Sequence, residues 1–177
     1  MRLLGLSGSQ RRVSTNMALL RAMAAHAPAT IKVEITDLIG QLPIFNPDNE
    51  GALTPASVLA LAGQIRAADG LIVACPEYAH GIPGGLKNAL DWMVSRDEIP
   101  FKPVMLVRAS TRSDIALGAL QEVLRTMSLD LMPDVGFAIH LLGRASERMD
   151  EMFASADVQA EMLNSLTRFA DWINRPH

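Results

Sequence analysis

The sequence predicts an α/β protein, a three-layer sandwich in which a five-stranded parallel sheet carries helices on both faces. Short apolar runs alternate along the chain with segments whose apolar residues recur at helical spacing, five of each. Two of the runs, residues 71–75 and 104–107, are continuous rather than alternating, which is typical of strands covered on both faces. Strands that alternate with helices favour a parallel sheet, because each helix carries the chain back to the starting edge.

The chain opens with a strand, a helix and a second strand. Residues 2–6 are apolar and end in a Ser-Gly-Ser turn. Ser14 is a candidate N-cap for the helix that follows, and Pro28 ends that helix. Residues 31–35 alternate with period two, which indicates a strand with one wetter face. The apolar face of the helix is expected to comprise Met17, Leu20, Ala24 and Ala27.

A long loop and a second helix lead to the third strand. Residues 38–53 are rich in Pro and Asn, and loops of this length in a compact domain are often functional. Thr54 and Pro55 then provide a cap and a proline suited to the start of a helix. The third strand covers residues 71–75. The helix before it has the apolar residues Val58, Leu61, Ile65 and Ala68.

The second half of the chain continues the alternation. We expect helices over residues 85–94, 116–127 and 158–173, and strands over residues 104–107 and 131–139. Charged residues of both signs precede the last helix and indicate a solvated stretch: Arg144, Glu147, Arg148, Asp150 and Glu151.

Composition narrows the class of protein. The 177 residues suit a single domain over 1–177, and the net charge of −3 gives no positive field for nucleic acid. No apolar run approaches the length of a membrane span, and the single Cys75 fits a reducing compartment, so we expect a cytoplasmic protein. We expect no metal site, because the histidines lack metal-ligand spacing.

The loop after the first strand, residues 7–16, has the chemistry of an anion site. It combines hydroxyl and amide groups with Arg11 and Arg12, and it precedes a helix N-terminus, which favours a phosphate. Gly8 lets the backbone approach a ligand closely. The spacing matches neither a dinucleotide fingerprint nor a P-loop. A polar loop with a capping serine is the alternative interpretation.

The loop after the third strand is the second unusual segment. Tyr78, the single tyrosine of the chain, lies between Pro76 and Pro83 in a stretch rich in glycine. A rigid loop with exposed backbone N–H groups suits the edge of a flavin ring, although a turn whose tyrosine merely packs would show the same pattern.

Together the two loops resemble the NADPH-dependent FMN reductase family of flavodoxin-like proteins, which includes quinone, chromate and azo-dye reductases. The matching stretches are Gly8-Ser9-x-Arg11-x-x-Ser14-x-Asn16, Pro76-Glu77-Tyr78 and Pro83-Gly-x-Leu-Lys-Asn-Ala-x-Asp-Trp92. The resemblance implies a flavodoxin-like sheet of order 2-1-3-4-5, bound FMN as cofactor, and NADPH or NADH as electron donor.

The resemblance also implies the residues of the cofactor site. Those expected at the FMN phosphate are Ser9, Arg11, Ser14 and Asn16, and those expected along the ribityl chain and ring are Pro76, Glu77, Tyr78 and Gly81. Ala79, His80 and Ser110 complete the cofactor-binding candidates. Family members often have asparagine where Ala79 stands, and a glycine pair where this chain has Ser110. His80 is either a proton donor or a solvent-exposed polar residue.

The implied function is an NAD(P)H-dependent oxidoreductase that passes hydride through FMN to a small acceptor, such as a quinone, free flavin, chromate or an azo compound. We assign no catalytic side chain, because the flavin carries the chemistry. A flavodoxin-type electron carrier and a flavin-based redox regulator are the alternatives. The family resemblance implies a homodimer or homotetramer. Trp92, outside the apolar stripe of its helix, is either a core residue or an interface residue. Cys75 is a small core residue or a redox-sensitive thiol.

Overall fold

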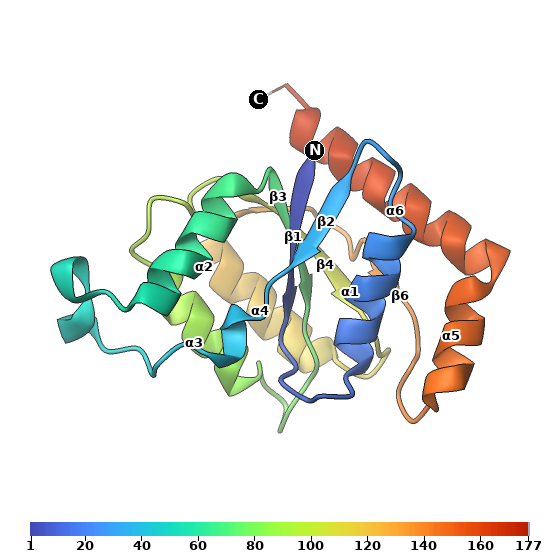
Figure 1. The fold of residues 1–177 in the computed structure, drawn as a ribbon, viewed down its shortest axis with the longest axis horizontal. Coiled ribbons are helices and arrows are strands. Elements are labelled where there is room, and N and C mark those ends of the chain that lie inside the picture. Colours follow the sequence, from blue (N-terminus) through green and yellow to red (C-terminus); the bar gives the residue numbers. More distant parts are fainter. Residues whose placement is uncertain (177) are drawn as a thin grey trace.

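A parallel β-sheet forms the middle layer of the molecule, of which the computed structural model describes residues 1–176 (Figure 1). The strands are β1 Arg2–Ser7, β2 Lys32–Ile35, β3 Gly70–Ala74, β4 Pro103–Arg108, β5 Asp130–Leu131 and β6 Phe137–Ala138. Their order is β2-β1-β3-β4-β5, and β6 also pairs with β4. Every pairing is parallel. The predicted fold and the order 2-1-3-4-5 are therefore confirmed.

Helices cover both faces of the sheet, and a separate hydrophobic cluster fills each interface (Figure 1). The helices are α1 Thr15–Ala25, α2 Ala56–Ala67, α3 Gly84–Met93, α4 Asp114–Thr126, α5 Ser146–Ala154 and α6 Ala156–Asn174. Buried residues of α2, α3 and α4 pack with Leu4 and Leu6 of β1, whereas those of α1, α5 and α6 pack with Leu3. Alternate residues of one strand thus serve opposite cores, as period-two geometry requires. None of the helices described is both long and apolar enough to cross a bilayer.

The last strand differs from the prediction. Residues 131–139 do not form one strand, because the chain leaves the sheet after β5 and returns to β4 only at β6. Pro133 lies in this break and has no N–H to donate to a neighbouring strand. Gly136 passes so close to Met105 that an added Cβ would collide with that side chain. Both short strands lie on the same side of β4, so together they take the place of the fifth strand.

Part of the expected solvated stretch forms a sixth helix, and its charged residues are exposed as expected. Residues 146–154 form α5, whose Met149 and Phe153 are buried one turn apart while its charged residues remain outside. Two of these charged residues pair with each other, Arg148 with Glu151 at 2.6 Å. Two apolar residues at i and i+4 suffice to fix this short helix on the core, a signal that the surrounding charges obscured.

The 38–53 loop contains three 3-10 turns, Leu38–Gly40, Pro47–Asn49 and Gly51–Leu53, and α3 holds it in place. The side chain of Asn88 accepts a hydrogen bond from Phe45 N at 2.8 Å and donates one to Pro43 O at 2.9 Å. Trp92 Nε1 donates to the same carbonyl at 2.7 Å, and the Trp92 ring packs edge-on against Phe45. Trp92 is therefore a core residue buried beneath the loop, which confirms the core alternative and contradicts the interface one. Val94, which the apolar pattern of residues 85–94 predicts to face inward with Leu86, Leu90 and Met93, is 55% exposed.

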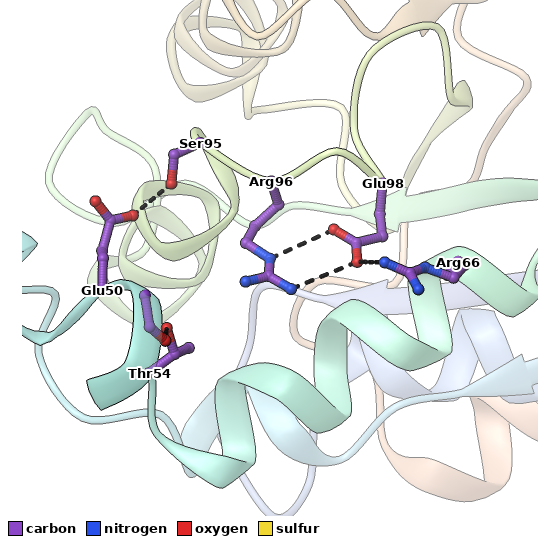
Figure 2. A network of polar contacts seen from close by, with 7 residues as sticks. Glu50, Thr54, Arg66, Ser95, Arg96 and Glu98 are labelled. Carbon is purple, nitrogen blue, oxygen red and sulfur yellow. Dashed lines mark hydrogen bonds and ion pairs between the residues drawn. The ribbon is translucent and has the colours of Figure 1, made fainter.

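A second polar network fastens the segment after α3 to α2 (Figure 2). The side chain of Glu98 is only 3% exposed, and it pairs with Arg66 at the end of α2 and with Arg96. Burial raises the pKa of Glu98, but the hydrogen bonds from its own backbone and from Arg96 and Arg66 outweigh burial and leave the pKa lowered. Ser95 in turn donates to Glu50 of the 38–53 loop. These contacts are structural, since none of the five residues of this network lines the cleft described below.

Candidate cofactor site

A cleft of about 300 Å³ lies at the carboxyl end of the sheet. Its walls are the loops that follow β1, β3 and β4, together with the turn before α5. The chain reverses its direction across the sheet between β1 and β3, and ligands of open α/β sheets bind at such switch points. The cleft is therefore where the fold itself predicts a ligand.

The β1–α1 loop presents the N-terminus of α1 to this cleft. Ser14 is the N-cap, as predicted, and its Oγ accepts a hydrogen bond from Met17 N at 3.2 Å. The hydroxyl proton of Ser14 stays available for a ligand. The N–H groups of Thr15 and Asn16 lie in the first turn of α1, where no carbonyl of the helix can reach them. Both residues line the cleft, which suits an anion.

Asn16 gives the clearest sign that a ligand belongs here. The residue is buried, and within residues 1–176 its Oδ1 has no hydrogen-bond partner. A buried polar atom without a partner costs free energy on the order of 1–3 kcal/mol. An amide oxygen needs a donor, and the hydroxyls of a ribityl chain are such donors. The donor set of this cleft therefore fits a phosphorylated polyol such as FMN.

The two unusual loops of the sequence meet at the cleft. Gly8 N donates to Ala74 O at 2.9 Å, and a Cβ added to Gly8 would lie 3.0 Å from Pro76 Cδ. The absence of a side chain at Gly8 thus allows the two loops to touch. The hydroxyls of Ser9 and Tyr78 lie 3.3 Å apart, within hydrogen-bond distance. Phosphate-loop and tyrosine-loop residues consequently form one continuous wall.

The tip of the tyrosine loop is a two-residue hairpin. Tyr78 and Gly81 exchange backbone hydrogen bonds of 3.1 and 3.0 Å. Between them Ala79 and His80 have φ values of 50° and 57°, which define a turn of type I′. Asn and Gly favour such positions, whereas an Ala there is strained. The structure places Ala79, His80 and Gly81 at this tip, outside the residues that line the cleft.

Glu77 fastens the tyrosine loop to helix α4. One oxygen of its carboxylate accepts a hydrogen bond from Ala116 N at 2.9 Å, in the first turn of α4. The other lies 3.1 Å from Nδ1 of His80, whose side chain is 78% exposed. The N–H of Ala116 is the main reason that the pKa of Glu77 is lowered, with His80 adding to the effect and burial opposing it.

Ser110 also lines the cleft, as predicted, and it shapes the β4–α4 loop. Its Oγ accepts a hydrogen bond from Arg112 N at 3.1 Å, and its carbonyl accepts one from Arg108 Nε at 3.2 Å. Cys75 lies at the base of the cleft, where burial, assisted by the charge of Glu77, raises the pKa of its thiol to about 12. A thiol held protonated in this way is a poor nucleophile. Residues 1–176 contain no group of three or more His, Cys, Asp or Glu side chains suited to a metal ion.

Of the predicted residues, those that line the cleft are Ser9, Arg11, Ser14, Asn16, Pro76, Glu77, Tyr78 and Ser110. The lining residues that the sequence did not predict are Val13, Thr15, Cys75, Arg112, Ser113, Leu142, Gly143, Arg144 and Met149. Arg144 was assigned to the solvated stretch because its neighbours are charged. Only the pairing of Leu141 N with Ala109 O, which brings this turn beside the end of β4, reveals its place.

Known proteins resemble this chain in sequence and in fold. The NADPH-dependent FMN reductase family matches the chain over residues 1–141. The quinone reductase of Escherichia coli K12 is 41% identical over 110 residues, which span 59% of this chain and 57% of that protein. The NADH:(hydroxy)cinnamate reductase subunit CrdA of Vibrio ruber is 33% identical over 184 residues, covering 94% of this chain and 90% of the relative.

Among solved structures, FerB from Paracoccus denitrificans, a flavoenzyme NAD(P)H:(acceptor) oxidoreductase, superposes with a TM-score of 0.73. Its sequence is 25% identical, and the superposition covers 97% of this chain and 96% of FerB. The family match covers most of the chain, and its description contains the two cofactors expected from the sequence. The chain belongs to the NADPH-dependent FMN reductase family.

Proposed function

We propose that this protein binds FMN non-covalently in the cleft and acts as an NAD(P)H-dependent reductase of small electron acceptors. One observation carries the proposal: the N-terminus of α1, the residue Asn16 with its unpartnered amide oxygen, and the tyrosine loop all line a single cleft at the switch point of the sheet. The first feature suits a phosphate, the second a ribityl hydroxyl and the third the edge of a flat ring.

The binding roles follow from the donors and acceptors of each residue. The first turn of α1, the hydroxyl of Ser14 and the guanidinium of Arg11 are the proposed ligands of the phosphate. Ser9, whose Oγ also accepts from Arg11 N at 3.4 Å, holds the loop in shape. Asn16 Oδ1 is proposed to accept a hydrogen bond from a ribityl hydroxyl. Pro76, Glu77 and the hairpin 78–81 are proposed to line the ring, largely through their backbone.

FMN, when bound, supplies the redox chemistry: it accepts hydride from a nicotinamide and delivers electrons to an acceptor. The chain itself binds, orients and shields. Glu77 is already engaged with Ala116 and His80, so it is not a free base. His80 is exposed and lies outside the cleft lining, so we assign it no proton transfer and expect solvent to exchange protons. Tyr78 is 46% exposed at the rim, an arrangement that leaves room for donor and acceptor to enter in turn.

A quinone is the acceptor class that we propose first. The E. coli relative is named a quinone reductase, and the reaction needs only an open face beside the flavin. Free flavin, chromate and azo compounds also need only an open face beside the flavin, so they are the other acceptor classes. A homodimer or homotetramer stays a prediction from the family resemblance.

Steady-state kinetics test the reductase. Protein loaded with FMN is mixed with NADPH and benzoquinone, and the loss of nicotinamide absorbance is followed with NADH in a parallel series. We expect rapid, quinone-dependent oxidation. Protein that holds FMN but oxidises neither nucleotide would instead be an electron carrier, and the proposed activity would fail.

A further inference from the structure

Three arginines line the cleft, and each comes from a different segment of the chain. Arg11 lies in the β1–α1 loop, Arg112 in the β4–α4 loop and Arg144 in the turn before α5. All three are exposed. Within residues 1–176, none of them forms an ion pair with a carboxylate, which leaves their guanidinium groups available to a ligand.

Two arginines that lie near Arg112 and Arg144 in the sequence, but outside the cleft lining, do have carboxylate partners. Arg108 pairs with Asp114 at 2.7 Å, and Arg148 pairs with Glu151 at 2.6 Å. Carboxylates are therefore present on both segments, yet they engage the arginines that do not line the cleft. On these two segments, within residues 1–176, the arginines that line the cleft are the ones without a carboxylate partner.

The charge of the cleft matches one phosphate monoester. Glu77 is the one acidic residue among the lining residues, and its carboxylate is held by the first turn of α4. Three guanidinium groups against this carboxylate leave two positive charges. A phosphate monoester carries about −1.5 to −2 at pH 7, whereas riboflavin, which lacks the phosphate, carries none. FMN therefore neutralises the cleft, and riboflavin leaves it charged.

Arg144 is held in place by its backbone. Leu141 N donates to Ala109 O at 3.0 Å, and Arg144 N donates to Leu141 O at 3.1 Å, so the turn is fixed to the end of β4. Buried Met149 anchors the helix that follows. Arg144 also lies beyond residue 141, where the family match ends, so it is a feature of this chain that the match does not account for.

We infer that Arg112 and Arg144 join Arg11 in binding the phosphate of the flavin, and so select FMN over riboflavin. This inference rests on the proposed function, since it concerns the same cleft. Arginine suits the task because its planar fork can bind two phosphate oxygens at once. Contacts from three segments would also hold the cofactor between the β1–α1 loop, the β4–α4 loop and the turn before α5.

Flavin titrations test the inference. Dissociation constants of FMN and of riboflavin are measured by flavin fluorescence for the wild type, Arg112→Ala, Arg144→Ala and the double variant. Arg148→Ala is the matched control, because it removes a positive charge four residues from Arg144 without changing the cleft lining. We expect each cleft variant to weaken FMN binding about tenfold, since the contact is charge-assisted but partly screened by solvent. Riboflavin binding should not change, and Arg148→Ala should bind both flavins as the wild type does.

The outcomes separate the inference from the proposed function. A wild type that binds neither flavin would refute the proposed function. A wild type that binds FMN, with cleft variants that retain its affinity, would refute only the inference. Equal weakening of FMN and riboflavin would also refute it, and so would unchanged FMN affinity with a raised KM for NADPH. Arg144→Lys provides a second check, because it keeps the charge and should fall between the alanine variant and the wild type.

Discussion

The carboxylate of Glu77 accepts a hydrogen bond from the backbone N–H of Ala116 at 2.9 Å, and this contact joins the tyrosine loop to the first turn of α4. A helix N-terminus stabilises a negative charge. The contact therefore fixes the loop after β3 relative to α4.

Glu77→Gln should therefore alter how stability depends on pH. Because the pKa of Glu77 is lowered in the fold from its ordinary value of 4.5, the ionised carboxylate stabilises the native state above that pH. This stabilisation is lost as the pH falls below 4.5 towards the lowered pKa. The difference in urea midpoint between the wild type and Glu77→Gln should be largest near neutral pH and shrink on acidification. Glu122→Gln, on the exposed side of α4, is the control and should show no such convergence; a Glu77 difference that stays constant with pH would contradict the account.

Ala79→Asn should stabilise the hairpin. Ala79 has a φ of 50°, and a left-handed conformation costs an ordinary residue roughly 1–2 kcal/mol, much of which Asn recovers. We expect the free energy of unfolding to rise by about 0.5–1 kcal/mol in thermal or urea denaturation. Ala52→Asn, in an exposed turn without a positive φ, should have no such effect. A neutral or destabilising Ala79→Asn would show that the turn is not strained.

Asn88→Ala should release the 38–53 loop. The change removes the acceptor of Phe45 N and a donor to Pro43 O, at a cost of about 1–2 kcal/mol for two partly exposed hydrogen bonds. Hydrogen exchange of the loop amides should quicken more than that of the sheet. Lys87→Ala, which breaks only an exposed pair with Asp91, serves as the comparison. Equal exchange in both variants would mean that Asn88 does not hold the loop.

Cys75 should be unreactive in the native protein. Burial raises the pKa of its thiol to about 12, so almost no thiolate exists at pH 8. Alkylation by iodoacetamide is expected to proceed only as fast as the protein opens, and Cys75→Ala should retain flavin binding. Rapid stoichiometric labelling of folded protein would restore the redox-sensitive alternative.

Much of the fold could be predicted from local patterns, but the break in the fifth strand and the helix α5 could not. Continuous apolar runs such as residues 71–75 located the central strands, because both faces of those strands are buried. The fifth strand was predicted as one piece, since apolar residues continue across Pro133 and the break depends on hydrogen bonding to β4. Helix α5 was missed because its charges outnumber the two apolar residues that bury it.

The candidate site shows the same division. Ser14, Arg11 and Tyr78 lie in segments with distinctive composition next to strand ends, so they could be found from sequence. Arg144 could not, because a charged residue in a charged stretch carries no sign of its spatial neighbours. Trp92 falls outside the apolar stripe of α3, which made an interface a plausible alternative to the core. A loop more than forty residues earlier in the sequence covers it. Long-range contacts of this kind are invisible to helical periodicity.

The most direct test is a titration of the purified protein with FMN, followed by absorption and fluorescence, with NADPH then added in the absence of oxygen. The cleft predicts saturable binding of one FMN per chain, with a perturbed flavin spectrum that bleaches when NADPH is added. Protein that remains colourless and leaves the spectrum and fluorescence of added FMN unchanged would contradict the account.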